Sequence, residues 1–129
     1  NVIRGGGVAG IRVAGTVRAA NNQFIGTSLR KVGPPNFAIW GLKGSRVMMT
    51  NNDVAGWRHA LHSTEGRVSA KGNSVSRFHL AAFVIQKPAS DPLVSDNEVT
   101  TASPSDQVCL IDGKPAAADA NKLIRSDQR

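Results

Sequence analysis

Alternation of apolar and polar side chains is the feature that most constrains this chain. Between residues 11 and 18, Ile11, Val13 and Val17 fall on one face of an extended segment, whereas Arg12 and Arg18 fall on the other. Because successive side chains of a β-strand point to opposite faces, this period of two predicts a strand with one buried side. The first core element is therefore expected to be a strand with a basic outer face.

Four further strands and one helix are predicted from the same patterning. A short helix is expected directly after Asp53, a good N-cap, because Val54, Trp57 and Leu61 recur at helical spacing. The predicted class is mainly β, with the helix between the third and fourth strands. The other strands, bounded by Gly, Pro or Asn, are expected in residues 36–42, 45–50, 65–72 and 76–87.

The chain has 129 residues, enough for one ordinary domain, and its composition changes near residue 88. Residues 88–106 contain three prolines among Ser, Thr, Asp and Asn, which is typical of an extended segment. Beyond them we expect a late strand closed by Asp112-Gly113 and a short helix in 116–124, and we find no internal repeat. The predicted parts are a glycine-rich N-terminal arm (1–10), a folded domain (11–87) and an extended polar C-terminal segment (88–129).

Charge is distributed unevenly along the chain. Residues 1–87 contain twelve Lys or Arg and two Asp or Glu. Residues 88–129 contain four Lys or Arg and seven Asp or Glu, and the net charge of the whole chain is +7. A strongly basic body suits a polyanionic partner, because each neutralised phosphate releases counterions. The alternative to a polyanionic partner is that the positive charge only keeps the protein soluble. The longest apolar run, 78–86, is too short to cross a bilayer, so we expect no membrane partner.

Gly5, Gly7 and Gly10 spell G-x-G-x-x-G, the fingerprint of dinucleotide-binding βαβ units. That fingerprint needs a strand before it, a helix after it and an acid about twenty residues later. Only four residues precede Gly5, and no acid occurs between Gly10 and Asp53. A flexible arm is therefore the favoured interpretation, and a dinucleotide-binding enzyme fragment is the weaker alternative.

Three segments resemble single-stranded DNA-binding proteins of the bacterial and mitochondrial type. They are "RVAGTV" (12–17), "LRKVGPPNFAIWGL" (29–42) and "EGRVSAKGNSVSRFHLAAFVI" (65–85), and the tail "QVCLIDGKPAAA" (107–118) is similar to OB-fold subunits of kinetoplastid mitochondrial RNA-editing complexes. The order strand, strand, strand, helix, strand, strand is also that of the OB-fold, a five-stranded Greek-key barrel. The expected fold is therefore an OB-fold barrel.

The resemblance implies a non-catalytic subunit that binds single-stranded RNA or, less favourably, DNA. A second OB-fold subunit, identical or different, is the expected protein partner. The resemblance adds a mitochondrial location to the intracellular one that the single cysteine favours. A basic coat or scaffold protein that uses charge alone is the alternative function. Binding needs a cationic groove with a stacking platform, for which Trp40 is the aromatic candidate. The candidate nucleic-acid-binding residues are Arg12, Arg18, Arg30, Lys31, Trp40, Lys43, Arg46, Lys71, Arg77 and His79.

Catalytic and metal chemistry have little support in the sequence. His59 and His62, with Glu65 and His79, invite a zinc hypothesis, but no complete ligand set with a known spacing is present. The single cysteine, Cys109, excludes an internal disulfide and suits a reducing compartment. We therefore expect no catalytic residue, no cofactor and no metal. The chain begins with Asn and shows no leader, which fits a processed product.

Overall fold

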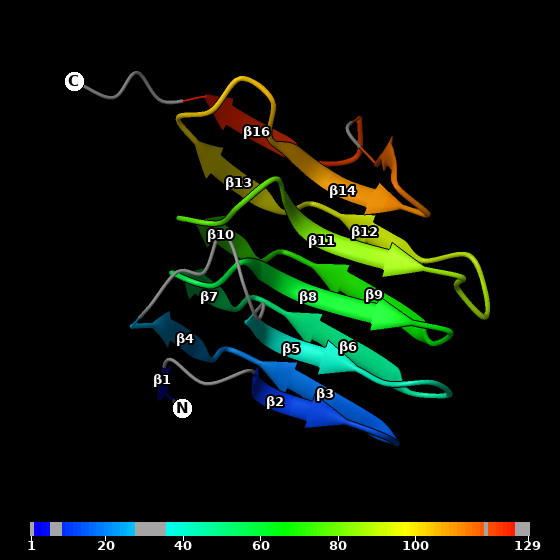
Figure 1. The fold of residues 1–129 in the computed structure, drawn as a ribbon. Coiled ribbons are helices and arrows are strands. Elements are labelled where there is room, and N and C mark those ends of the chain that lie inside the picture. The colour runs from blue at the N-terminus through cyan, green and yellow to red at the C-terminus, as the bar shows by residue number, and fades with distance from the viewer. Residues whose placement is uncertain (1, 6–8, 28–35, 118, 126–129) are drawn as a thin grey trace.

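The computed structural model describes residues 2–5, 9–27, 36–117 and 119–125. Within these ranges the chain forms sixteen β-strands and no helix. The strands form three sheets that wind around a common axis (Figure 1), and the pairing of β14 with β15 is the one antiparallel pairing among the described strands. The fold is a β-solenoid of about five turns.

We call the three sheets A, B and C, and each turn of the solenoid adds one strand to each of them in that order. In the last turn, a hairpin of β14 and β15 in sheet B takes the place of a sheet C strand. Sheet A contains β1 (Val2–Gly5), β4 (Gln23–Gly26), β7 (Asp53–Ala55), β10 (Ser74–Ser76), β13 (Glu98–Thr101) and β16 (Lys122–Arg125). Sheet B contains β2 (Ala9–Val13), β5 (Phe37–Gly41), β8 (His59–Thr64), β11 (Ala81–Gln86), β14 (Gln107–Ile111) and β15 (Lys114–Ala116). Sheet C contains β3 (Thr16–Ala20), β6 (Arg46–Thr50), β9 (Arg67–Lys71) and β12 (Leu93–Ser95).

The core consists of apolar side chains that stack in register from one turn to the next. Parallel pairing places equivalent residues of successive turns beside each other, so one apolar position per strand builds a continuous column along the axis. In sheet A the column is Phe24, Val54, Val75 and Val99. In sheet B it is Ile39, Leu61, Phe83 and Cys109, all fully buried.

A ladder of buried asparagines closes the corner between sheets C and A. The side-chain oxygen of Asn52 accepts the backbone N–H of Asn22, and this step repeats through Asn73, Asn97 and Asn121 at 2.8–2.9 Å. Each side-chain amide also donates to a backbone carbonyl one turn earlier, as Asn73 does to Met49. The ladder thus satisfies polar groups that the tight corner would otherwise leave buried and unpaired.

The residue before each of three ladder asparagines has a left-handed backbone, as the sharp corner requires. It is Asn51 (φ 54°) before Asn52, Gly72 (φ 72°) before Asn73 and Asp96 (φ 56°) before Asn97. Gly, Asn and Asp adopt this conformation more readily than other residues. The corners therefore depend on both residues of the pairs Asn-Asn, Gly-Asn and Asp-Asn.

The OB-fold expectation is wrong, because the described strands form open parallel sheets stacked along an axis and not a five-stranded Greek-key barrel with a helix. Residues expected in the helix form β7, a corner and β8. The side chains expected on the apolar side of the helix are nevertheless buried: Val54, Trp57 and Leu61. Two short strands joined by a corner place inward-facing residues at the same sequence spacing as one face of a helix. The strands expected in 36–42, 45–50 and 65–72 are confirmed as β5, β6 and β9. The single strand expected in 11–18 is wrong, because a corner at residues 14–15 divides it between β2 and β3, which lie in different sheets.

Both ends of the chain differ from their expected form. The glycine-rich arm contributes β1 and the start of β2, so Gly5 and Gly10 lie in strands, and Gly7 lies outside the described residues. The expected extended segment after residue 88 contributes β12 to β16, of which β12 pairs with β9 and β13 with β10. Its late strand is confirmed as β14, but its expected helix is absent and β16 lies there. No helix of the described chain is long and apolar enough to span a membrane.

Candidate functional site

The strands of sheet C carry the largest net positive charge among the three described sheets. Inward residues such as Val47, Met49 and Ala70 are buried, and the residues between them point outward. The four strands contribute four basic residues and no acid. We call the outer face of sheet C the basic face, and its cations, all exposed, are Arg18, Arg46, Arg67 and Lys71.

Two of these cations stand directly beside each other. Arg46 of β6 is the register partner of Arg67 of β9, and neighbouring strands are about 4.8 Å apart. Among the described residues, neither guanidinium has an ion pair, and the recorded side-chain hydrogen bonds do not involve them. Like charges on neighbouring strands repel each other, so the free protein holds an arrangement that a bound anion would relieve.

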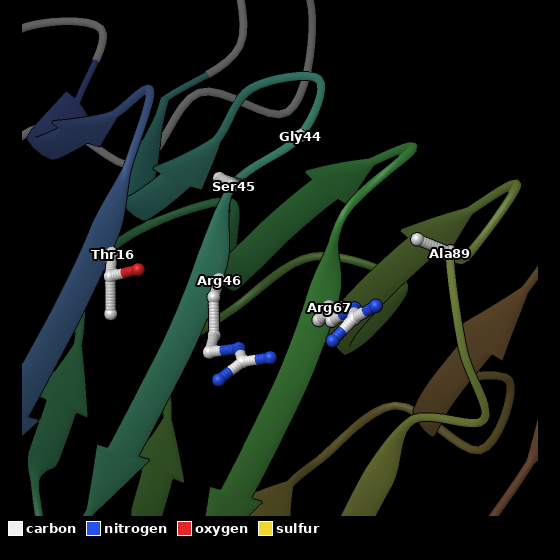
Figure 2. Close-up of a pocket in the computed structure, with 6 residues that line it drawn as sticks. All are labelled: Thr16, Gly44, Ser45, Arg46, Arg67 and Ala89. Atoms are coloured by element: carbon white, nitrogen blue, oxygen red, sulfur yellow. The ribbon is translucent and has the colours of Figure 1, made fainter.

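A hollow of about 390 Å³ lies between these arginines and the corner that precedes their strands. Figure 2 shows the side chains of Arg46 and Arg67 on the same side of sheet C, with the Thr16 hydroxyl pointing toward the strand of Arg46. Gly44 and Ala89 form its small-residue rim, and Ser45 completes the wall. The hollow therefore has two cations and a hydroxyl group among its lining side chains.

Backbone hydrogen bonds hold the walls of the hollow. The N–H of Arg46 donates to the carbonyl of Gly15 at 2.9 Å, and the N–H of Arg67 donates to the carbonyl of Ser45 at 2.8 Å. Gly44 permits the turn before β6, with φ +80°. Three successive turns of the solenoid thus fix the starting points of β3, β6 and β9.

The acid at the neighbouring corner is already engaged. The carboxylate of Glu65 lies 3.6 Å from the ammonium of Lys43, the one salt bridge recorded among the described residues. This pair is solvent-exposed and contributes little to stability. It nevertheless directs the nearest glutamate toward Lys43, and the two arginines remain available to a ligand.

The sequence-predicted binding residues separate onto different surfaces. Arg18, Arg46 and Lys71 are brought together on the basic face, whereas Arg12 and Trp40 lie together on the outside of sheet B. Lys43 lies at the corner between sheets B and C, and Arg77 and His79 lie at the corner between sheets A and B. Arg30 and Lys31 lie outside the described residues.

Arg67 is the functional candidate that sequence reasoning missed. The signal was a repeated heptapeptide pattern, Arg-Val-x-x-x-x-Asn, in 46–52 and 67–73, with Thr-Val-x-x-x-x-Asn in 16–22. The pattern places Thr16, Arg46 and Arg67 in one column, as their register confirms. Recognising it as a repeat would have predicted both the solenoid and the arginine pair.

Sheet B carries an aromatic and imidazole cluster on its outer side. The ring of Phe37 stacks on those of His59 and His62, with centroids 5.6 and 4.5 Å away, and meets Trp40 edge-on. Arg12 lies over Trp40 at 5.2 Å, a cation–π contact. Trp40 is half-buried and already occupied on one side by Arg12.

The histidines of this cluster are neutral at neutral pH. Burial lowers the pKa of His59 to about 4, against the smaller opposing effect of its hydrogen bond to the Ala81 carbonyl, and burial also lowers the pKa of His62. No group of three or more His, Cys, Asp or Glu side chains able to hold a metal occurs in the described ranges. Cys109 is fully buried, and burial raises the pKa of its thiol to about 12. A thiol of this kind is a core side chain and a poor nucleophile.

Expectations that rested on the OB barrel lose their basis with it: the single-strand groove, the RNA-editing role and the mitochondrial location have no support in the observed fold. No protein-family model, curated protein or solved structure matches this chain. The geometry of the basic face is consequently the strongest indication of what the molecule binds.

Proposed function

We propose that this protein is a non-catalytic binding protein whose basic face holds an extended acidic polysaccharide. The observation that carries the proposal is the in-register pair Arg46 and Arg67, exposed and without an ion pair in the described chain. Such a pair is unfavourable in the free protein and becomes favourable when an anion lies between the two guanidinium groups.

The solenoid favours an extended polymer over a small ligand. Because each turn repeats the previous one, outward side chains recur along the axis at intervals of one strand, about 4.8 Å. A polymer that runs straight across the strands meets Thr16, Arg46 and Arg67 in one row, and one that runs obliquely also meets Arg18. Arg18 and Lys71 extend the positive charge along the strands, toward their C-terminal ends.

The other side chains of the face favour sugar over nucleic acid. Binding of single strands normally uses aromatic side chains on which bases stack, and the four strands of sheet C contain no aromatic residue. Instead, the outer face presents the hydroxyls of Thr16, Thr50 and Ser69 beside the apolar Met48. Hydroxyls and aliphatic groups suit the mixed polar and apolar surface of a pyranose ring.

The test compares binding of heparin, polygalacturonate, uncharged dextran and single-stranded RNA across a salt series by surface plasmon resonance. We expect both acidic polysaccharides to bind and dextran not to bind. The variant Arg46→Glu/Arg67→Glu should weaken binding at least about tenfold, equivalent to about 1.4 kcal/mol. A charge-matched control, Arg4→Glu/Lys122→Glu on sheet A, should change it less than about twofold, since those residues lie on another sheet.

Two outcomes would overturn the proposal. Equal losses in the two double variants would mean that net charge, and not the basic face, attracts the polymer. Tighter binding of RNA than of either polysaccharide at raised salt would show that the face serves nucleic acid.

A further inference from the structure

We infer that the hollow at Arg46 and Arg67 is a subsite for a tetrahedral monoester oxyanion, the group that a sulfated or phosphorylated sugar carries. This inference rests on the proposed function, because it assigns one position on the basic face to one kind of substituent. It selects among acidic polysaccharides those whose charge is a monoester and not a carboxylate.

The number of donors around the hollow supports this assignment. A guanidinium group donates through a planar fork and can engage two acceptors at once. Arg46 and Arg67 together present two forks, and the Thr16 hydroxyl adds a further donor on the same side (Figure 2). A carboxylate has two oxygens with about four acceptor positions, fewer than these five donors. A sulfate or phosphate monoester has three unesterified oxygens and can accept from all of them.

The arrangement of the donors also matches a tetrahedral group. The forks come from adjacent strands in register, and Thr16 comes from the strand on the far side of Arg46. The three donors stand in one row across the sheet, at intervals of about 4.8 Å, so they approach an acceptor from three separate points. A planar carboxylate offers its acceptors in one plane, whereas the oxygens of a monoester point in three directions.

Access and space agree with a substituent on a larger molecule. The volume of about 390 Å³ exceeds that of a single oxyanion, and Gly44 and Ala89 leave the rim without a large side chain. A sugar ring can therefore lie at the entrance while its monoester group contacts the arginines. Arg4, an exposed arginine on β1 of sheet A, lies outside the basic face and does not line the hollow, so it supplies a matched control.

The experiment titrates sodium sulfate, sodium phosphate and sodium acetate into the ¹⁵N-labelled protein at constant ionic strength, while NMR follows the Nε–H signals of arginine. We expect sulfate and phosphate to shift the Arg46 and Arg67 signals saturably, and acetate to bind at least about tenfold more weakly. Comparison of the sulfate and phosphate curves identifies the preferred ester. Arg46→Lys and Arg67→Lys should each weaken sulfate or phosphate binding about tenfold, because lysine keeps the charge but lacks the fork. Arg4→Lys, on sheet A, should leave it unchanged.

Failure of this inference is distinguishable from failure of the proposed function. Acetate that binds as tightly as sulfate would overturn the monoester assignment, and so would full retention of sulfate affinity in both lysine variants. In either case, binding of polygalacturonate and heparin that still depends on Arg46 and Arg67 would leave the polysaccharide proposal standing. Equal binding of all polymers, whatever their charge, would overturn both the monoester assignment and the polysaccharide proposal.

Discussion

At the scale of single residues, the ladder asparagines do more for this fold than their polar character suggests. Asn73 accepts the backbone N–H and side-chain amide of Asn52, and donates to Met49 and Asn97. It is 1% exposed, so none of these groups has water as a substitute partner. One side chain thus links three turns of the solenoid.

We expect Asn73→Ala to lower the free energy of unfolding by about 3 kcal/mol, because orphaned buried polar groups cost about 1–3 kcal/mol each. The control is Ser74→Ala, at the exposed neighbouring position. Urea denaturation followed by circular dichroism measures the difference. A loss no greater than that of the control would mean that the ladder is not needed for stability.

His59 makes the fold sensitive to acid. Its pKa is about 4 in the folded chain and 6.5 when unperturbed, so folding favours the neutral ring. The stabilisation is complete above pH 6.5 and is lost as the pH falls toward 4, by up to about 3 kcal/mol at about 1.4 kcal/mol per pKa unit. Thermal unfolding between pH 8 and 4 should show this loss, and His59→Phe should reduce it. A variant with an unchanged pH profile would exclude His59 as the cause.

At the scale of the element, sheet C separates stability from binding. Its inward residues form the core, whereas its outward cations face solvent. Arg67 faces Arg46 across one strand spacing, but Arg18 faces the neutral Met48. The sheet therefore contains two arginines that are like-charged neighbours and a third, Arg18, whose strand neighbour is neutral.

Arg67→Gln should raise the melting temperature of the free protein by about 1–2 °C at low salt, because it removes the repulsion from Arg46. Arg18→Gln should leave it nearly unchanged. The difference should vanish in 1 M salt, where screening extends over only about 3 Å. Differential scanning calorimetry tests this; a lower melting temperature for Arg67→Gln would show that the Arg67 side chain stabilises the fold.

At the scale of the whole molecule, the solenoid presents three independent outer faces. The basic face belongs to sheet C, while Trp40 and its aromatic neighbours belong to sheet B. Trp57, the other tryptophan, is 2% exposed. A ligand on sheet B should therefore change the tryptophan emission, whereas a ligand on sheet C should not.

Saturation with heparin should leave the tryptophan emission unchanged, because neither tryptophan lies on the basic face. Acrylamide quenching with and without heparin is the measurement, and Trp40→Phe identifies the contribution of Trp40. Protection of Trp40 by heparin would place the polymer on sheet B and contradict the assigned face.

Local sequence predicted several strands correctly, because alternation such as that in 46–50 depends only on which side chains are buried. It failed at Trp57, whose spacing from Val54 and Leu61 fits both a helical stripe and two strands joined by a corner. Local sequence also predicted a cationic site that includes Arg18, Arg46 and Lys71. The same prediction wrongly grouped them with residues such as Trp40, which lies on a different sheet. Distances between successive turns depend on pairing across 21 to 30 residues, which local patterns do not encode.

The sequence by itself determined a mainly β chain with a strongly basic body, since composition and alternation are local properties. It also contained the asparagine repeat that closes each turn, although this repeat is irregular in spacing. Only the tertiary structure decided that the strands coil in parallel and that Arg46 stands beside Arg67. The physical reason is register: the stacking of buried columns and asparagine ladders fixes which residues become neighbours, and that choice creates the binding surface.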